Sequence, residues 1–346
     1  MYLNSFNHFR AIAITFIVAG HCYTLSGIGF TSNLEKIIVN IITGGTTLFV
    51  FISGFLFHYI FYKKYQYTNF VLLKFKNVFL PYILLGALPV LLYTMKGTND
   101  WGGFFYPSGN GYYDEYFLPA VKYYWTGRFL TAYWYVPFIL VTFLLSPLHI
   151  LFIKSRPKIQ IFITILLCLV SVFMHRPIDN LFVFQSVVYF TPVYLIGILC
   201  SVYRDIVHSK LKGKELVLLA AILTLAIIQA LVGVVGNYHK SPFEYGGLDI
   251  MFIQKILMSI FFMVFLARFE SLNAEISNSM AATSFTIFFI HPFVLWEVNK
   301  YFGQYIATGS WVGFMFCVVA IIVICVTLAK IIKRTIPNYS RFIVGY

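Results

Sequence analysis

Apolar residues fill ten stretches of this chain, separated by segments that hold most of its polar side chains. The hydrocarbon layer of a bilayer is spanned by about 20 consecutive apolar residues of α-helix. A window of that length predicts helices near residues 9–29, 37–62, 71–94, 133–153, 159–174, 183–203, 215–236, 249–268, 283–299 and 309–332. No linker rich in serine, proline or charge interrupts the series. We therefore predict an all-α, polytopic transmembrane helical bundle of about ten spans, forming a single domain over residues 1–346.

The composition favours the same conclusion, because 60% of the residues are hydrophobic and only 11% are charged. A soluble domain carries about a quarter charged residues. The net charge of +13 comes from lysines and arginines in short loops between apolar stretches, not from one face of a domain. Such loop charges indicate membrane topology. The lipid bilayer is the expected partner, and we expect no nucleic acid.

Counting these basic residues orients the predicted helices, because cytoplasmic loops carry the excess of lysine and arginine. The side that holds both termini has 17 basic residues, and the opposite side has 7. The remaining one, Lys255, lies within a predicted span. We predict a multi-pass protein of the cell (inner) membrane with both termini in the cytoplasm.

The longest connection, about residues 95–132, lies on the predicted outer side and holds eleven aromatic residues between 101 and 125. A long loop so rich in rings is unlike a disordered segment. It could form an aromatic belt at the membrane interface. It could also be a platform for sugar rings, with Asp100, Asn110, Asp114 and Glu115 accepting or donating hydroxyl hydrogen bonds.

The first predicted helix contains Arg10 and His21, although an ionisable side chain at the centre of a span costs about 2.5–3.5 kcal/mol. Arg10 alone could extend to the interface. Eleven positions of helix, however, bring His21 to within about 20° of Arg10 and about 16 Å deeper. The spacing predicts one cavity, with a guanidinium suited to phosphate at its mouth and an imidazole able to accept a proton further in.

Four motifs occur in a recognisable order along the chain. They are the arginine and histidine of a first helix that opens FRAIAI, FVFISGFLF at 49–57, YWYVPFIL at 133–140 and FFIHPFVL at 288–295. Together they resemble the membrane-bound acyltransferase-3 family. The resemblance implies transfer of an acyl group, usually acetyl from acetyl-CoA, to a hydroxyl of an extracytoplasmic saccharide or lipid-linked glycan.

By this resemblance His21 and Arg10 take the catalytic roles, and Arg10 also binds the donor. Acetyl-CoA, or another acyl-CoA, is then a donor substrate, and no permanently bound cofactor is expected. A positioned general base contributes about 10²–10⁴-fold to such a reaction, and His21 could act as this base or carry the acyl group itself.

The second predicted cytoplasmic loop departs from the family pattern. Members often have an Arg-x-x-Arg pair there, whereas this chain has Lys74 and Lys76. Lysines neutralise phosphate but lack the bidentate fork of arginine. Lys74 and Lys76 could therefore bind CoA, or they could only anchor the helix ends on the cytoplasmic side.

Five further residues are candidates for the pore or the acceptor side: Ser53, Trp134, Tyr135, His291 and Glu297. His291 should reach a depth similar to that of His21, or it could donate a hydrogen bond to another helix. Glu297 could orient an acceptor hydroxyl or lie in the interface. Trp134 and Tyr135 could border the acceptor groove or belong to an aromatic belt. Ser53 and the glycines near it favour close helix packing.

A transporter or flippase of a lipid-linked saccharide is the main alternative, because ten spans and intramembrane polar residues suit it equally. The chain shows no inverted repeat of broken helices and few intramembrane carboxylates for ion coupling. A receptor or scaffold would leave the four motifs unexplained. The histidines form no HxxxH or other spacing typical of a metal site, so no metal is expected.

Overall fold

The computed structural model describes residues 3–96, 105, 109 and 111–346. Its α-helices are α1 Asn4–Ser26, α2 Asn33–Ile42, α3 Gly45–Leu56, α4 Tyr67–Lys74, α5 Leu80–Lys96, α6 Leu118–Thr126, α7 Tyr135–Leu144, α8 Ser146–Lys154, α9 Pro157–Met174, α10 Val183–Val202, α11 Arg204–Leu211, α12 Glu215–Leu231, α13 Ile250–Leu266, α14 Glu275–Ile306, α15 Trp311–Thr335 and α16 Ser340–Val344. Two short parallel strands, β1 Arg176–Pro177 and β2 His239–Lys240, pair Arg176 with His239. The predicted all-α fold is confirmed.

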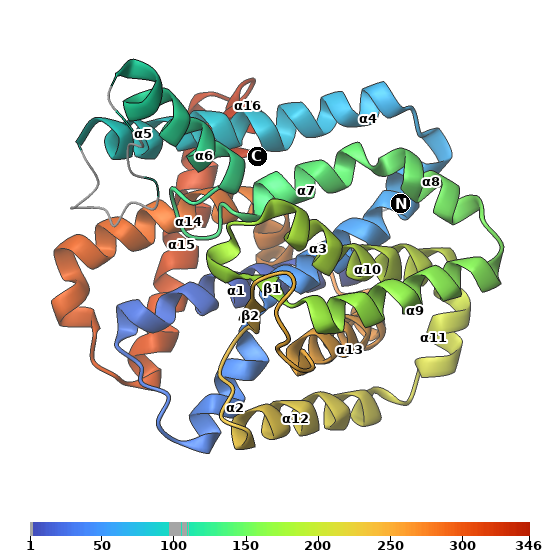
Figure 1. Ribbon diagram of the computed structural model, residues 1–346. Helices are drawn as coiled ribbons and strands as arrows, with labels where there is room; N and C mark the ends of the chain where they lie inside the picture. The colour runs from blue at the N-terminus through green and yellow to red at the C-terminus, as the bar shows by residue number, and fades with distance from the viewer. Residues whose placement is uncertain (1–2, 97–104, 106–108, 110) are drawn as a thin grey trace.

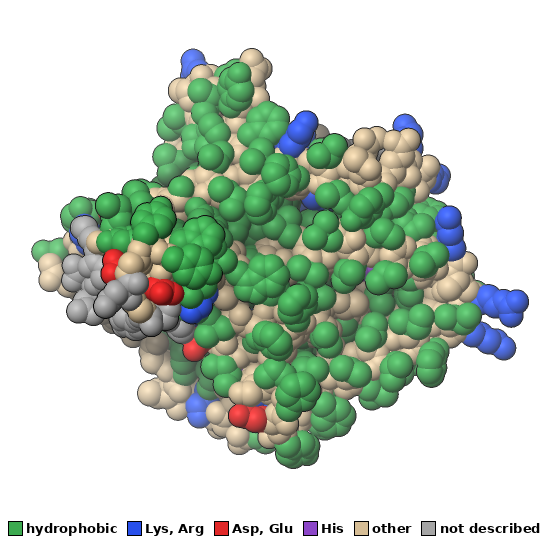
Figure 2. Space-filling view, turned by 45° about the horizontal axis from the view of Figure 1, so that its top comes forward, with side chains coloured by type: hydrophobic (Ala, Val, Ile, Leu, Met, Phe, Trp, Pro, Cys, Tyr) green, Lys and Arg blue, Asp and Glu red, His purple; other side chains and the backbone are tan. Residues whose placement is uncertain are grey.

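In the described part of the chain, eight helical segments are long and apolar enough to cross a membrane. Two bent pairs raise that number to as many as ten: α7 with α8, bent by 54°, and α11 with α12, bent by 85°. Both bends have local causes, since Pro147 follows the first residue of α8, and Gly213 adopts a positive φ between α11 and α12. Figure 2 shows the resulting broad hydrophobic surface, with lysine and arginine side chains mostly near its margins.

Helix α1 is one of the interior elements of the bundle. Figure 1 shows it crossing the middle of the molecule, with α4 near the top of the view and α12 near the bottom. It packs against α3, α13, α14 and α15, and side chains such as Phe9, Val18 and Cys22 are fully buried. Gly27, in the left-handed conformation, ends the helix. Polar groups of α1 are therefore held among other helices and not in lipid.

The second predicted span is broken between α2 and α3, where Gly44 adopts a positive φ. The break leaves backbone carbonyls without helical partners, which is costly where water is excluded. The buried Lys255 of α13 compensates, because its Nζ donates to the carbonyl oxygens of Asn40 at 2.9 Å and Ile41 at 2.6 Å. Lys255 thus stabilises an irregular segment that, as described below, borders a cavity.

Helices α3 and α10 approach each other closely through two glycines. A β-carbon at Gly54 would overlap the carbonyl oxygen of Tyr194, and one at Gly197 would overlap that of Phe51. Small residues at such positions allow backbones to come together where no hydrophobic effect drives helix association. The sequence prediction that the small residues around Ser53 serve close packing holds for Gly54.

We expect Gly54→Ala to destabilise the protein by about 1–3 kcal/mol, because the added methyl group can be accommodated only by separating α3 from α10. Thermal unfolding of the purified protein in detergent would measure the effect. Gly29→Ala is the matched control, since its β-carbon would meet only the methyl group of Thr31, at 3.9 Å. Equal melting temperatures for the two variants would contradict the packing described here.

Candidate active site

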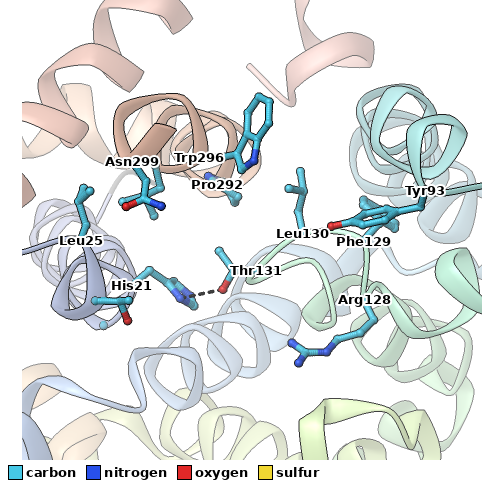
Figure 3. Close-up of a pocket in the computed structure, with 13 residues that line it drawn as sticks. His21, Leu25, Tyr93, Arg128, Phe129, Leu130, Thr131, Pro292, Trp296 and Asn299 are labelled. Atoms are coloured by element: carbon cyan, nitrogen blue, oxygen red, sulfur yellow. Dashed lines mark hydrogen bonds between the residues drawn. The ribbon is translucent and has the colours of Figure 1, made fainter. Parts of the chain in front are cut away.

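His21 projects from α1 into a cavity of about 440 Å³, here called the histidine cavity. Its other walls come from α5, through Tyr93, from α14, through Pro292, Trp296 and Asn299, and from the segment that follows α6. Figure 3 shows the imidazole pointing at Thr131 of that segment. His21 Nδ1 and Thr131 Oγ1 are 2.9 Å apart and hydrogen-bonded.

The segment that carries Thr131 runs from Gly127 to Trp134 without regular helix. Gly127 has a positive φ, and a β-carbon there would overlap the carbonyl oxygen of Tyr133. Only glycine fits such a position without displacing the backbone. Tyr133 itself is fully buried and donates a hydrogen bond to the carbonyl of Phe289, at 2.8 Å. These contacts fix the turn that presents Thr131 to His21.

The His291 ring lies next to the His21 ring, with 5.5 Å between the two ring centroids. Its side chain is completely buried and is not part of the cavity lining. Its Nδ1 must donate, because it lies 2.8 Å from the carbonyl oxygen of Ile287, which can only accept. Its Nε2 has no hydrogen-bond partner among the described residues. His291 Nε2 is therefore an acceptor nitrogen.

A second cavity of about 150 Å³ adjoins the first and shares Gly20, His21, Arg128 and Thr131 with it. We call it the arginine pocket. Its further lining residues are Phe16, Ile17, Thr43, Gly44, Gly45, Thr46, Ala132, Trp134, Arg176, Asn180, Asn237, His239 and Phe288. The broken segment between α2 and α3 thus forms one wall, and the loops that carry β1 and β2 form another.

Arg176 is the buried cation of this pocket. Its guanidinium carbon lies 4.5 Å from the centre of the Trp134 ring, and the β1–β2 pairing fixes its backbone beside His239. Burial lowers the pKa of Arg176 to about 10, so the group remains charged at neutral pH. Arg128, at the boundary of the two cavities, forms an ion pair with Asp179, with 3.2 Å between Nη2 and Oδ1.

Arg10 lines a different cavity, of about 400 Å³, which we call the basic cavity. Lys74, Lys333 and Arg341 line it as well, together with Asn77, and no acidic side chain does so among the described residues. Arg10 Nη2 donates to Ser284 Oγ of α14, at 2.7 Å. Arg341 reaches the cavity because the short α16 packs against α5 and α14.

The basic cavity adjoins a smaller apolar chamber of about 130 Å³. The two share Arg10, Phe61, Lys74 and Phe285, and the chamber is otherwise walled mainly by rings and aliphatic side chains. Lys74 Nζ lies between 4.6 and 5.3 Å from the centres of the Phe61, Phe70 and Phe143 rings. A basic mouth therefore leads to an apolar interior.

The two sets of cavities lie along consecutive turns of the same helices. On α14, Phe285 lines the basic cavity and Phe288 the arginine pocket. On α3, Phe49 lines the apolar chamber and Thr46 the arginine pocket. The helical spacing of Arg10 and His21 predicted one cavity for both residues. The structure differs, because the two residues line separate cavities.

A comparison with protein-family models finds one match, to the acyltransferase-3 family, whose model is described as an acyltransferase domain and covers residues 3–330. The chain belongs to the acyltransferase-3 family. Searches of curated proteins and of solved structures each found no match. The family and the apolar helices together identify this protein as a multi-pass membrane acyltransferase.

Three residues predicted for the acceptor side of this acyltransferase lie near its cavities. Trp134 lines the arginine pocket. Ser53 lines the apolar chamber with Arg10, and so lies apart from His21. Tyr135 is buried and packs against Phe288, with ring centroids 5.3 Å apart, but it is not part of either lining.

Other predicted residues lie away from the cavities of the acyltransferase. Lys76 is exposed and, unlike Lys74, does not line the basic cavity. Glu297 is exposed and follows Trp296, which lines the histidine cavity. Asp114 and Glu115 belong to the single π-helical turn Tyr113–Phe117, outside the cavity linings. Several residues of the predicted aromatic platform lie outside the described residues: Asp100, Trp101, Phe104, Tyr106 and Asn110.

Four residues that line these cavities were not predicted from the sequence: Thr131, Arg176, Lys333 and Arg341. The three basic ones counted there only as charges that orient the helices. Nothing local distinguishes them, since Arg176 depends on the pairing of β1 with β2 and Arg341 on the packing of α16. Among the described residues no three histidine, cysteine, aspartate or glutamate side chains gather as a metal site would require.

We expect Thr131→Val to lower kcat about tenfold, because loss of the hydrogen bond frees the His21 ring to rotate. Thr131→Ser, which keeps the hydroxyl, should retain most of the activity. Steady-state acyl transfer by the two purified variants would measure the difference. Equal rates for Val and Ser would mean that Thr131 does not orient His21.

Proposed function

We propose that this acyltransferase binds acyl-CoA, acetyl-CoA in the simplest case, in the basic cavity and acylates a saccharide hydroxyl in the histidine cavity. The observation that carries the proposal is the placement of Arg10 and His21, one at each set of cavities, along a single helix. Eleven residues of helix separate them by about 16 Å. A long, flexible pantetheine arm suits such an arrangement.

The basic cavity has the chemistry that a coenzyme A donor requires. Arg10, Lys74, Lys333 and Arg341 offer guanidinium and ammonium groups to phosphates. The adjoining apolar chamber suits the uncharged pantetheine and acyl portions. Asn77 adds an amide that can hydrogen-bond to the donor. Donor affinity would then come mainly from phosphate contacts, and acyl selectivity from the size of the chamber.

In the proposed reaction the neutral His21 acts as general base at Nε2. In the tautomer that this reaction requires, Nδ1–H donates to Thr131 Oγ1, 2.9 Å away, and the Nε2 lone pair is free to accept the proton of the acceptor hydroxyl. The hydroxyl oxygen attacks the thioester carbonyl, so a C–O bond forms and the C–S bond breaks. The CoA thiolate then takes the proton from the imidazolium, which restores the neutral base.

The orientation of the basic residues supports a donor site on the cytoplasmic side. Arg10, Lys74, Lys333 and Arg341 all belong to the side of the sequence that carries 17 basic residues. Arg128 and Arg176, which line the opposite cavities, belong to the side that carries 7. We therefore propose cytoplasmic termini, a cytoplasmic acyl-CoA and an acceptor glycan or glycan-lipid at the outer face of the inner membrane.

The test is to incubate the purified protein in lipid nanodiscs with radiolabelled acetyl-CoA and a panel of saccharides. We expect release of CoA and an alkali-labile label on one class of saccharide. Mass spectrometry of the quenched protein would detect an acyl group on His21 if the transfer were covalent. If labelled lipid-linked saccharide crosses a proteoliposome membrane unmodified while no acyl ester forms, the protein is a flippase and the proposal fails.

A further inference from the structure

Arg176 is a buried cation whose hydrogen-bond donors are not all satisfied. Only 6% of its surface is exposed. Its Nη2 donates to Asn180 Oδ1 at 3.2 Å, whereas its Nε has no partner among the described residues. It forms no ion pair with any carboxylate in the described ranges. Because an unmatched buried donor is costly, a guanidinium in this state favours a ligand that accepts from it.

The surroundings hold the guanidinium ready for such a ligand. The guanidinium carbon lies over the Trp134 ring, 4.5 Å from its centre, and this cation–π contact restricts the rotation of the group. Asn180, Asn237 and His239 line the same pocket and offer further hydrogen-bonding groups. No aspartate or glutamate appears in the described lining of this pocket. The pocket therefore combines a fixed cation with polar neighbours that suit a sugar.

Asp249, the carboxylate that acts electrostatically on Arg176, is engaged in other hydrogen bonds. Asp249 accepts hydrogen bonds from the Tyr189 hydroxyl and the Phe252 amide, each at 2.8 Å, so both of its oxygens are occupied. Burial raises the pKa of Asp249 to about 6. Asp249 moderates the field around Arg176 without forming an ion pair with it. Asp249 therefore leaves Arg176 without a carboxylate partner among the described residues.

We propose that the arginine pocket binds an anionic group of the acceptor saccharide, with paired oxygens of a carboxylate or phosphate against Arg176. A planar guanidinium recognises both groups through two parallel hydrogen bonds. Arg176 and His21 line the same pocket, so the bound anion would hold a neighbouring hydroxyl near the imidazole. This inference rests on the proposed function and makes the acceptor an acidic saccharide.

The test compares three disaccharides that differ at one position, which carries a carboxylate (glucuronate), a 6-phosphate or a neutral hydroxymethyl group (glucose). Calorimetry with the wild-type protein in nanodiscs measures binding without requiring turnover. We expect one or both acidic disaccharides to bind roughly 10–100-fold more tightly than the neutral one. Comparing the glucuronate with the 6-phosphate disaccharide identifies which anion is preferred. Free glucuronate, but not glucose, should compete with a bound carboxylate ligand.

Two substitutions separate charge from geometry. Arg176→Gln should abolish the preference for acidic acceptors, whereas Arg176→Lys should retain part of it because it keeps the charge but not the fork. Lys122→Gln, on α6 and outside both linings, is the control and should behave like the wild type. The competition experiment needs no variant, so it remains decisive if Arg176→Gln does not fold.

Two outcomes would overturn the inference. One is equal wild-type affinity for acidic and neutral disaccharides. The other is a variant Arg176→Gln that lowers kcat equally for every acceptor and leaves KM unchanged, since Arg176 would then act on the transition state. If the wild-type protein prefers acidic disaccharides but acylates none of the acceptors tested, the inference stands and the proposed function fails.

Discussion

Replacing His21 by alanine will lower the rate of acyl transfer by roughly 10²–10⁴-fold, the contribution expected of a positioned general base. Without the imidazole, the acceptor hydroxyl must attack at its free pKa, where it is a poor nucleophile. The loss should appear in kcat, with little change in the KM for acyl-CoA, because His21 lies apart from the basic cavity. Release of CoA in the presence of a saturating acceptor would measure it.

The fold should survive this substitution, because His21 is only partly buried and borders an open cavity. Equal elution volume and melting temperature for the variant and the wild type would show that it does. His208→Ala, on α11 and away from both linings, is the matched control and should keep full activity. Full turnover by a folded His21→Ala protein would remove His21 from the mechanism.

The double substitution Lys333→Gln and Arg341→Gln will raise the KM for acyl-CoA by roughly 10²–10⁴-fold. Each removes one charged hydrogen bond from the donor phosphates, and such bonds contribute about 1.5–3 kcal/mol. The value of kcat should change little, because both residues lie at the basic mouth and not beside His21. Initial rates over a range of acyl-CoA concentrations at fixed ionic strength would give both constants.

Lys158→Gln is the control for this effect. Lys158 is exposed at the start of α9, belongs to the same basic side of the sequence and lies outside the basic cavity. If Lys158→Gln raised the KM as much as the double variant, attraction of CoA to a generally basic surface would explain the result. The contribution of a specific cavity would then be excluded.

Hydropathy predicted the spans well, because helices in a bilayer must satisfy their own backbone hydrogen bonds over a fixed length. The bends were not predictable from it. The α7–α8 bend at Pro147 and the break at Gly44 involve single residues inside stretches that remain apolar throughout. The compensation of that break by Lys255, more than 200 residues away in the chain, depends entirely on tertiary packing.

The candidate site was predictable where its residues lie on a single helix. Arg10 and His21 are conspicuous because charge is costly within a span. Helical spacing gives the direction of a side chain but not what fills the space between two of them. Ile14 and Ile17 lie between Arg10 and His21 near the same face of α1, and both are buried. This face is therefore polar at Arg10 and at His21 but apolar between them. One predicted cavity therefore became two.

The proposed reaction requires the donor and the acceptor to enter this acyltransferase from opposite sides of the membrane. Proteoliposomes with acetyl-CoA outside and an acidic saccharide trapped inside test this requirement directly. The protein can be inserted in both orientations, because only molecules whose donor site faces outward can form product. We predict O-acetylated saccharide in this arrangement and none when donor and acceptor are both outside. Product formed only when both substrates are on the same side would contradict the claim.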